Sequence, residues 1–140
     1  MASNGEAMTD LPELVGICLC ERVSQDIFRK DAVTLVNVHN SFSSTSFPSM
    51  IPIIYAFAQL RGLPEAFTYQ FNVLSPEGEV IASSAPGQVE SLPTTEALHR
   101  VMSAFPGLVL PAPGFYKVVL KINEKPVGTL PLMVELVSAA

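Results

Sequence analysis

The chain of 140 residues has room for one domain, because two halves would each be too short to bury a proper core. Apolar residues make up 49% of the chain and charged residues only 15%, and the net charge of −5 includes just eight scattered Lys and Arg residues. This composition argues against binding to nucleic acid or to an anionic membrane, because both need clustered basic side chains.

The ends of the chain and its two cysteines indicate the domain boundaries and the cellular compartment. Residues 1–10 lack the basic start and apolar stretch of a signal peptide and have nothing to bury, so we expect a disordered tail there. Residues 11–137 are predicted to form a single domain, followed by a short tail at 138–140. Cys18 and Cys20 are two positions apart, too far in a strand to bridge comfortably. We therefore expect reduced thiols and a cytoplasmic protein.

The first half of the chain predicts strands at residues 14–23, 33–38 and 50–60. The first is apolar on both faces and is expected to be buried on both. A polar connector follows, in which Ile27 and Phe28 form an apolar plug. The Ser-rich stretch 39–48 either continues the second strand or forms a loop. The third strand is expected to turn Ile51, Ile53, Tyr55 and Phe57 to one face, with Pro52 at its start or at a sheet edge.

The second half predicts strands at residues 67–74, 80–84, 97–105, 115–122 and 127–137. In the first of these, Phe67, Tyr69, Phe71 and Val73 alternate with polar residues, and Ser75–Glu79 has the composition of a tight turn. Segment 97–105 has helical as well as alternating character, and a strand is expected because its surroundings are β. Residues 106–114 are expected to be an extended connector. Inward positions are predicted at Tyr116, Val118, Leu120, Ile122, Leu130, Leu132, Val134 and Leu136.

These elements together predict an all-β fold, an antiparallel β-sandwich (Ig-like or C2-like) of about seven or eight strands. A series of short signatures recurs along it: Cys20–Val23, Phe47-Pro48, Ser75–Val80, Pro106–Leu108, Pro113–Tyr116 and Thr129–Leu132. In this order they resemble a 6941-like family of small bacterial proteins, an uncharacterised domain-of-unknown-function family. The resemblance runs from about residue 14 to 134 and implies a bacterial β-sandwich. It implies no activity and no functional residue.

No constellation of residues predicts catalysis, a metal or a cofactor. Cys18 or Cys20 with His39 or His99 would be the ingredients of a nucleophilic site, but thiols among apolar strand residues are expected to be buried and inert. The spacing of Cys and His does not match a zinc site, and no Gly-rich phosphate loop is present. An enzyme of unknown type using Cys20 or His39 is the least favoured of three hypotheses.

The leading hypothesis is a non-catalytic interaction module that pairs with itself or with another protein. Residues 32–60 and 101–116 contain no Asp, Glu, Lys or Arg, and interface cores are depleted in charge and enriched in aromatics and Met. Central strands would give the same pattern. The predicted contact residues are His39, Asn40, Phe42 and Phe47. The second hypothesis is a small-ligand cleft lined by Tyr55, Phe57, Tyr69 and Phe71, although these aromatics are better explained as core residues.

Overall fold

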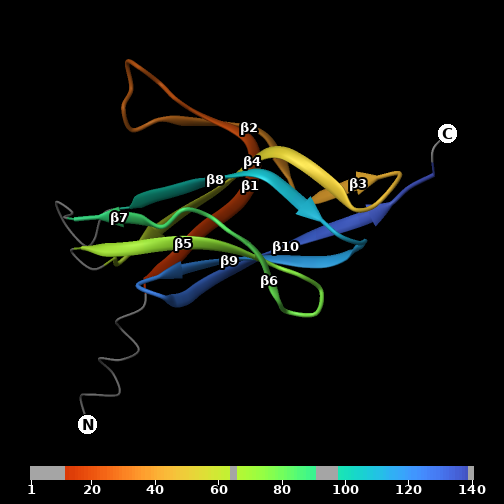
Figure 1. Cartoon of the computed structure of the whole chain (residues 1–140). Coiled ribbons are helices and arrows are strands. Elements are labelled where there is room, and N and C mark those ends of the chain that lie inside the picture. Colours follow the sequence, from red (N-terminus) through yellow and green to blue (C-terminus); the bar gives the residue numbers. More distant parts are fainter. Residues whose placement is uncertain (1–11, 64–65, 91–97, 139–140) are drawn as a thin grey trace, which may run out of the picture.

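The computed structural model describes residues 12–63, 66–90 and 98–138, and within them the chain consists of strands and their connections (Figure 1). The strands are β1 (Glu13–Gln25), β2 (Val33–His39), β3 (Ser41–Ser44), β4 (Ser49–Arg61), β5 (Phe67–Leu74), β6 (Val80–Ser83), β7 (Gly87–Val89), β8 (His99–Leu110), β9 (Gly114–Ile122) and β10 (Lys125–Leu136). No helix in these ranges is long and apolar enough to span a membrane.

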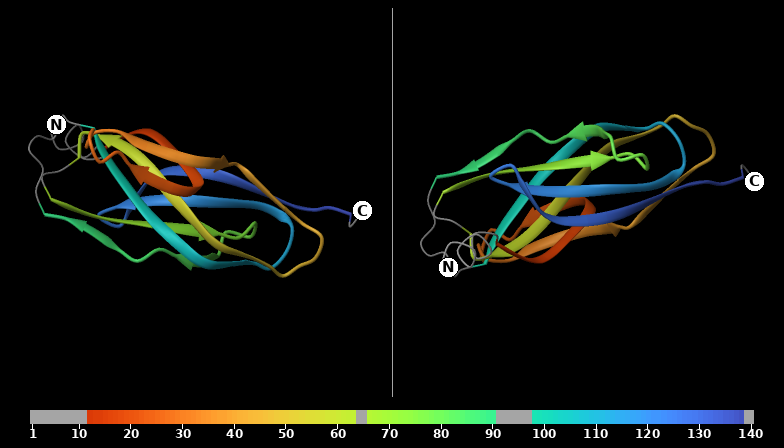
Figure 2. Two further views of the ribbon diagram at one scale, coloured as in Figure 1. Left: turned by 90° about the horizontal axis from the view of Figure 1, so that it is seen from above. Right: turned by 90° about the horizontal axis from the view of Figure 1, so that it is seen from below.

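The strands form two sheets that face each other, as the views from above and below show (Figure 2). The four-stranded sheet has the order β2-β1-β4-β8, and the six-stranded sheet has the order β3-β10-β9-β5-β6, with β7 also paired to β5. All pairs are antiparallel except β3 with β10, which is parallel. The predicted all-β sandwich is confirmed. The described residues form ten strands and not the predicted seven or eight, because the short strands β3 and β7 also pair.

One hydrophobic core fills the space between the sheets. On β9, the four predicted inward residues Tyr116, Val118, Leu120 and Ile122 are at most 3% exposed. Opposite them, β4 and β8 contribute Ile54, Ala56, Ala58, Leu60, Val101, Phe105, Leu108 and Leu110. The alternation predicted for β5 is confirmed, with Phe67, Phe71 and Val73 in the core and Tyr69 packed at its border. Removal of this apolar area from water is the main stabilising term of the fold.

The inward face of β4 differs from the prediction. Ile54, Ala56, Ala58 and Leu60 point into the core, so Tyr55 and Phe57 lie on the outer face of the four-stranded sheet. Both faces of this strand are apolar, so alternation alone does not choose between them, and a shift of one residue exchanges the faces. Of the four residues predicted to face inward, only Ile51 packs against the core, and Pro52, which follows it, is the one position in this part of β4 that has no partner in β8.

The predicted connector 106–114 is wrong over its first half, because β8 continues to Leu110. Pro106 pairs with Ile53 and Leu108 pairs with Ile51. β8 is the outermost strand of its sheet, where a proline without an N–H group costs no ladder bond. The strand predicted at 97–105 is confirmed from His99 onward, and its first residue lies outside the described ranges.

Several predicted burials fail at the ends of strands. Ile27 and Phe28, expected to plug the core, are 81% and 89% exposed at the turn between β1 and β2. Val15 is exposed beside a bulge in β1, and Leu136 is exposed near the end of β10. The predicted tail 1–10 lies outside the described residues, as does most of 138–140.

Candidate functional site

A groove opens where the two sheets part at one side of the sandwich. β1 pairs with β4 only as far as Cys20 opposite Tyr55, so the first half of β4 is paired to β8 alone. After His39 the chain leaves the four-stranded sheet, and β3 joins β10 of the other sheet. The gap between β3 and the unpaired edge of β4 is a groove of about 370 Å³. The groove therefore results from a strand that changes sheets.

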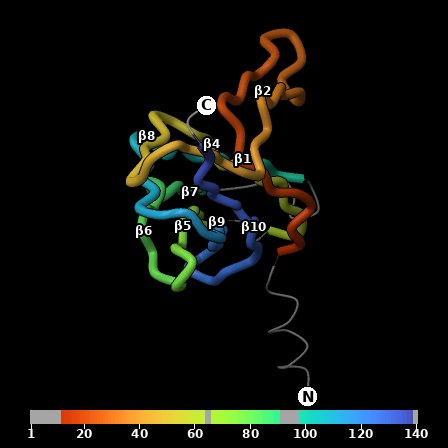
Figure 3. Tube along the Cα trace, turned by 90° about the vertical axis from the view of Figure 1, so that its right-hand side faces the viewer, coloured from red at the N-terminus to blue at the C-terminus, as the bar shows by residue number. Residues whose placement is uncertain are grey.

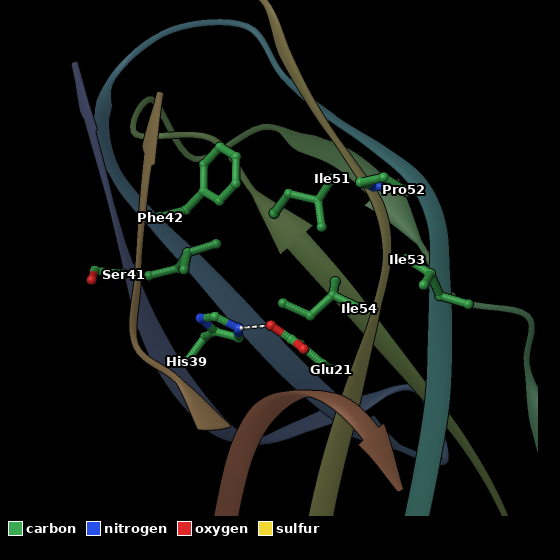
Figure 4. A pocket seen from close by; sticks show the side chains of 9 residues that line it. Glu21, His39, Ser41, Phe42, Ile51, Pro52, Ile53 and Ile54 are labelled. Carbon is green, nitrogen blue, oxygen red and sulfur yellow. Dashed lines mark hydrogen bonds and ion pairs between the residues drawn. The ribbon is translucent and has the colours of Figure 1, made fainter. Parts of the chain in front are cut away.

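The floor and walls of this groove are apolar. Phe42, Ile51, Ile54 and Leu132 line it together with Pro52 and Ile53, and Figure 4 shows Phe42, Ile51 and Ile54 directed toward one another from β3 and β4. A volume near 300 Å³ is the lower limit for ligand pockets, so the groove suits one or two large apolar groups.

A hydrogen-bonded cluster of Glu21, His39 and Asn37 lies at the mouth of the groove. The Nε2 atom of His39 is 3.0 Å from Oε2 of Glu21, and Nδ2 of Asn37 donates a 2.9 Å hydrogen bond to Oε1 of the same carboxylate (Figure 4). These bonds, from Asn37 first and then from His39, lower the pKa of Glu21 below its usual value. About half of the Glu21 side chain stays exposed, so the mouth presents an ionised carboxylate to solvent.

The turn between β1 and β2, residues 26–32, forms a projecting tip. Figures 1 and 3 show the β1–β2 hairpin rising from the four-stranded sheet on the side away from the other sheet. The carboxylate of Asp26 accepts hydrogen bonds from the backbone N–H groups of Phe28 and Arg29, at 2.7 and 2.9 Å, and pairs with the Arg29 guanidinium at 3.1 Å. These bonds lower the pKa of Asp26. The turn therefore holds Ile27 and Phe28 outward in a defined conformation.

The hairpin leans over one end of the four-stranded sheet. Nη1 of Arg100, at the start of β8, donates a 2.7 Å hydrogen bond to the carbonyl oxygen of Asp31. Residues Gln25, Lys30, Asp31 and Val33 of the hairpin line a hollow with residues 98–100 and Met102. The hairpin thus lies at the His99 end of β8, whereas the groove lies at the opposite end of β4, near Ile51.

An apolar strip runs along the outer face of the four-stranded sheet between these two features. Its exposed members are Val38, Met50, Ile53, Met102 and Val109, which are 36–59% exposed. β4 and β8 pair along the strip, with Met50 opposite Val109 and Phe57 opposite Met102. The two charge-free stretches of the sequence are thus neighbours in the sheet, and between these pairs neither strand carries a charged residue.

The four predicted contact residues are divided by the fold. His39 and Phe42 line the groove. Asn40 is exposed at the corner where the chain changes sheets, and its carbonyl oxygen accepts a 3.3 Å hydrogen bond from the N–H of Met133. Phe47 is half-buried and packs against the core. The contact residues stay a prediction, and the structure adds Glu21 and Ile51 to the same neighbourhood.

The thiols and imidazoles considered for catalysis lie apart. Cys20 pairs with Val38 and Leu19 pairs with His39, so the Cys20 thiol and the His39 ring point to opposite faces of the sheet. Burial raises the pKa of both Cys18 and Cys20, and both are free thiols, as expected. His99 packs edge-on against the Phe67 ring at 5.6 Å, and burial lowers its pKa.

The predicted ligand cleft does not form. Tyr55 and Phe57 lie on the outer face of one sheet, while Phe71 is fully buried in the core beneath the other. Among the described residues, no group of three His, Cys, Asp or Glu side chains is placed to hold a metal ion.

Sequence reasoning missed the exposed tip and the role of Glu21. The signal for the tip was present: Asp26 followed by Arg29 in a polar segment is turn composition, and apolar residues within a tight hairpin turn have no core to reach. Glu21 gave no signal, because its partner His39 is 18 residues away and the pairing depends on the register of β1 with β2.

Comparison with protein-family models gives a match over residues 16–135 to a family of unknown function (DUF6941). Among curated proteins, no significant match was found.

Proposed function

We propose, for a chain that belongs to the family of unknown function DUF6941, a non-catalytic role as an interaction module that pairs with a second copy of itself. The single observation that carries this proposal is the apolar strip on the outer face of the four-stranded sheet. A sheet face that carries exposed Met, Ile and Val side chains is normally covered by another element or by another chain.

A second copy fits the strip better than a charged partner does. The strip has no charged residue between the Met50–Val109 pair and the Phe57–Met102 pair, so two identical strips facing each other bring no like charges together. Two of its exposed residues are methionines, whose flexible side chains adapt to an opposing apolar surface. Sheets stacked in this way lie about 10 Å apart and interdigitate their side chains.

The pairing is proposed to occur in the cytoplasm. The free thiols Cys18 and Cys20 support this location, because oxidising compartments favour disulfides. The raised pKa values of both thiols and the opposite orientations of Cys20 and His39 support a non-catalytic role over a thiol-based enzyme.

The test is the dissociation constant of the pair, measured by sedimentation equilibrium on the full chain. The double variant Met50→Lys/Val109→Lys is expected to weaken pairing at least about 100-fold, because it sets like charges against each other at the contact. The matched control Thr68→Lys/Thr129→Lys places the same two charges on exposed positions of the six-stranded sheet and is expected to pair as the wild type does. A wild-type chain that sediments only as a monomer would refute the proposal.

A further inference from the structure

The structure holds an apolar knob and an apolar groove that the same chain cannot bring together. The knob is the pair Ile27 and Phe28 at the hairpin tip, 81% and 89% exposed. The groove lies at the base of the same hairpin, where Glu21 and His39 form its mouth. A strand rises about 3.3 Å per residue, so the five positions from Glu21 to Asp26 separate knob and mouth by roughly 17 Å. Contact therefore requires a second chain.

From this arrangement we propose that, in the pair of chains, the hairpin tip of each copy inserts Ile27 and Phe28 into the groove of the other. This inference rests on the proposed self-pairing and specifies how the two copies hold each other. Three observations carry it: the positions of knob and groove along the sheet, the apolar lining of the groove, and the charges beside each.

The positions match a two-fold arrangement. The hairpin overhangs the outer face at the Arg100 end of β8, and the groove opens at the Ile51 end of β4, next to Ile53 of the apolar strip. A two-fold axis through the middle of the strip reverses the partner end for end. Each hairpin then lies over the end of the other chain that carries the groove. Such a contact is reciprocal, so it closes at two copies and does not grow into a filament.

The surfaces match in chemistry. Phe42, Ile51, Ile54 and Leu132 give the groove an apolar interior of about 370 Å³, a size suited to one large aromatic side chain and its neighbour. Asp26 fixes the tip before contact, so little conformational entropy is lost when Phe28 enters the groove.

The charges at the rim are complementary. Lys30 is exposed immediately after Phe28 and Arg29 at the tip, and Glu21 presents an ionised carboxylate at the mouth of the groove. In the reciprocal arrangement each Lys30 approaches the partner's Glu21. Attraction at such a rim orients the partners and adds specificity to the apolar contact.

The decisive experiment combines a chain without a knob and a chain without a groove. Phe28→Asp removes the knob, and Ile51→Trp fills the groove with its own side chain. Each variant alone is expected to pair at least about 30-fold more weakly than the wild type, as loss of an interface hot spot does. Mixed in equal amounts, they are expected to form a heterodimer, because the intact tip of one chain meets the intact groove of the other. Val80→Asp, at an apolar position on β6 that is 55% exposed, is the control and is expected to have no effect.

Because Ile51→Trp changes a half-buried position and could affect folding, a second test of the contact exchanges the charges of Glu21 and Lys30. Glu21→Lys and Lys30→Glu change exposed groups only, and each is expected to weaken pairing several-fold. The double variant Glu21→Lys/Lys30→Glu is expected to recover most of the loss, which a double-mutant cycle quantifies.

The two proposals fail in different ways. If the wild type pairs and Phe28→Asp pairs equally well, the knob-and-groove contact is wrong while self-pairing stands. If the mixture of Phe28→Asp and Ile51→Trp forms no heterodimer, although each variant is folded by circular dichroism, the contact is wrong as well. If the wild type does not pair, self-pairing itself is refuted.

Discussion

The outer faces of the two sheets differ, although both sheets contribute equally apolar inner faces. Across the six-stranded sheet the outward positions include Thr68, Gln70, Lys117 and Lys121, together with the exposed apolar pair of Phe115 and Met133. Across the four-stranded sheet the corresponding positions are Met50, Ile53, Met102 and Val109. The fold requires only one apolar face from each sheet. On the second apolar face of the four-stranded sheet, Cys20 and Phe57 are buried within the chain, and the exposed remainder is the surface that the proposed pairing would cover.

The difference between the faces depends on the placement of charge in the sequence. β9 alternates Lys117 and Lys121 with core residues, whereas β4 and β8 are apolar in both phases of the alternation. Strands that are apolar on both faces are normally found where both faces of the sheet are covered. In this chain the six-stranded sheet covers one side only.

The largest effects on the free energy of unfolding are expected for core residues, and they should be similar for the two sheets. Phe71→Ala on β5 and Leu60→Ala on β4, both fully buried, are each expected to lower the free energy of unfolding by about 2–5 kcal/mol through lost burial and a residual cavity. Phe115→Ala, at a position 67% exposed on the outer face of the six-stranded sheet, is expected to change it by less than about 0.5 kcal/mol. Urea unfolding measures all three. A small loss at Leu60 alone would show that the core face of the four-stranded sheet is loosely packed.

Thiol alkylation reports on the outer face of the four-stranded sheet. Cys18 is half-buried there, in register with Phe57, while Cys20 is fully buried. Burial raises the pKa of both thiols, so both are expected to react slowly and Cys20 more slowly. Alkylation of Cys18 is expected to slow several-fold as the protein concentration rises through the pairing range, because the second copy covers the strip. If the alkylation rate of Cys18 does not depend on protein concentration, the strip is not the contact surface between the two copies. The variant Cys18→Ser is the control that identifies the alkylation signal of Cys20.

His99 links the two sheets at one end, and its titration is expected to give a smaller effect. Burial against Phe67 lowers its pKa from the ordinary value of 6.5, so the unfolded chain takes up a proton before the folded chain does. Stability is therefore expected to fall as the pH decreases through 6.5 toward the lower pKa of the folded state. His99→Gln is expected to flatten this part of the stability profile, measured by thermal unfolding between pH 7.5 and about 5. An unchanged profile would show that His99 stays solvated.

The smallest effect on global stability is expected at the hairpin tip. Asp26→Ala removes the acceptor for the N–H groups of Phe28 and Arg29, so exchange of these two amides is expected to speed up about tenfold or more while the unfolding midpoint hardly moves. Because the pKa of Asp26 lies below the ordinary 3.8, the native tip is expected to keep this order above that pH and lose it as the pH falls further. Equal exchange in the variant would show that the tip is not held by Asp26.

The sequence was sufficient for the fold class and for most strands, because alternation in β5 and β9 leaves one assignment of faces. It failed where alternation is uninformative. The β4 strand is apolar in both phases, and its inward face is decided by packing against the other sheet. Pro106 and Gly107 predict the end of a strand, yet β8 continues through them because an edge strand tolerates both residues.

The candidate site was predictable only in part. The charge-free stretches identified the strands of the apolar strip, and His39 and Phe42 do lie beside a groove. The groove itself depends on β3 leaving one sheet for the other, and the Glu21–His39 pair depends on the register of a hairpin. Neither is encoded in a local motif. The apolar composition of Ile27 and Phe28 predicts burial, but composition alone does not show whether a turn reaches the core, and both side chains are exposed.

The central claim, that the apolar strip is covered by a second copy, is tested most directly by native mass spectrometry of the untagged chain over a range of concentrations. Self-pairing predicts a species of twice the 15.0 kDa mass of the chain, which grows with concentration and is absent from the Met50→Lys/Val109→Lys variant. A wild-type spectrum that contains only the 15.0 kDa monomer at every concentration would contradict it.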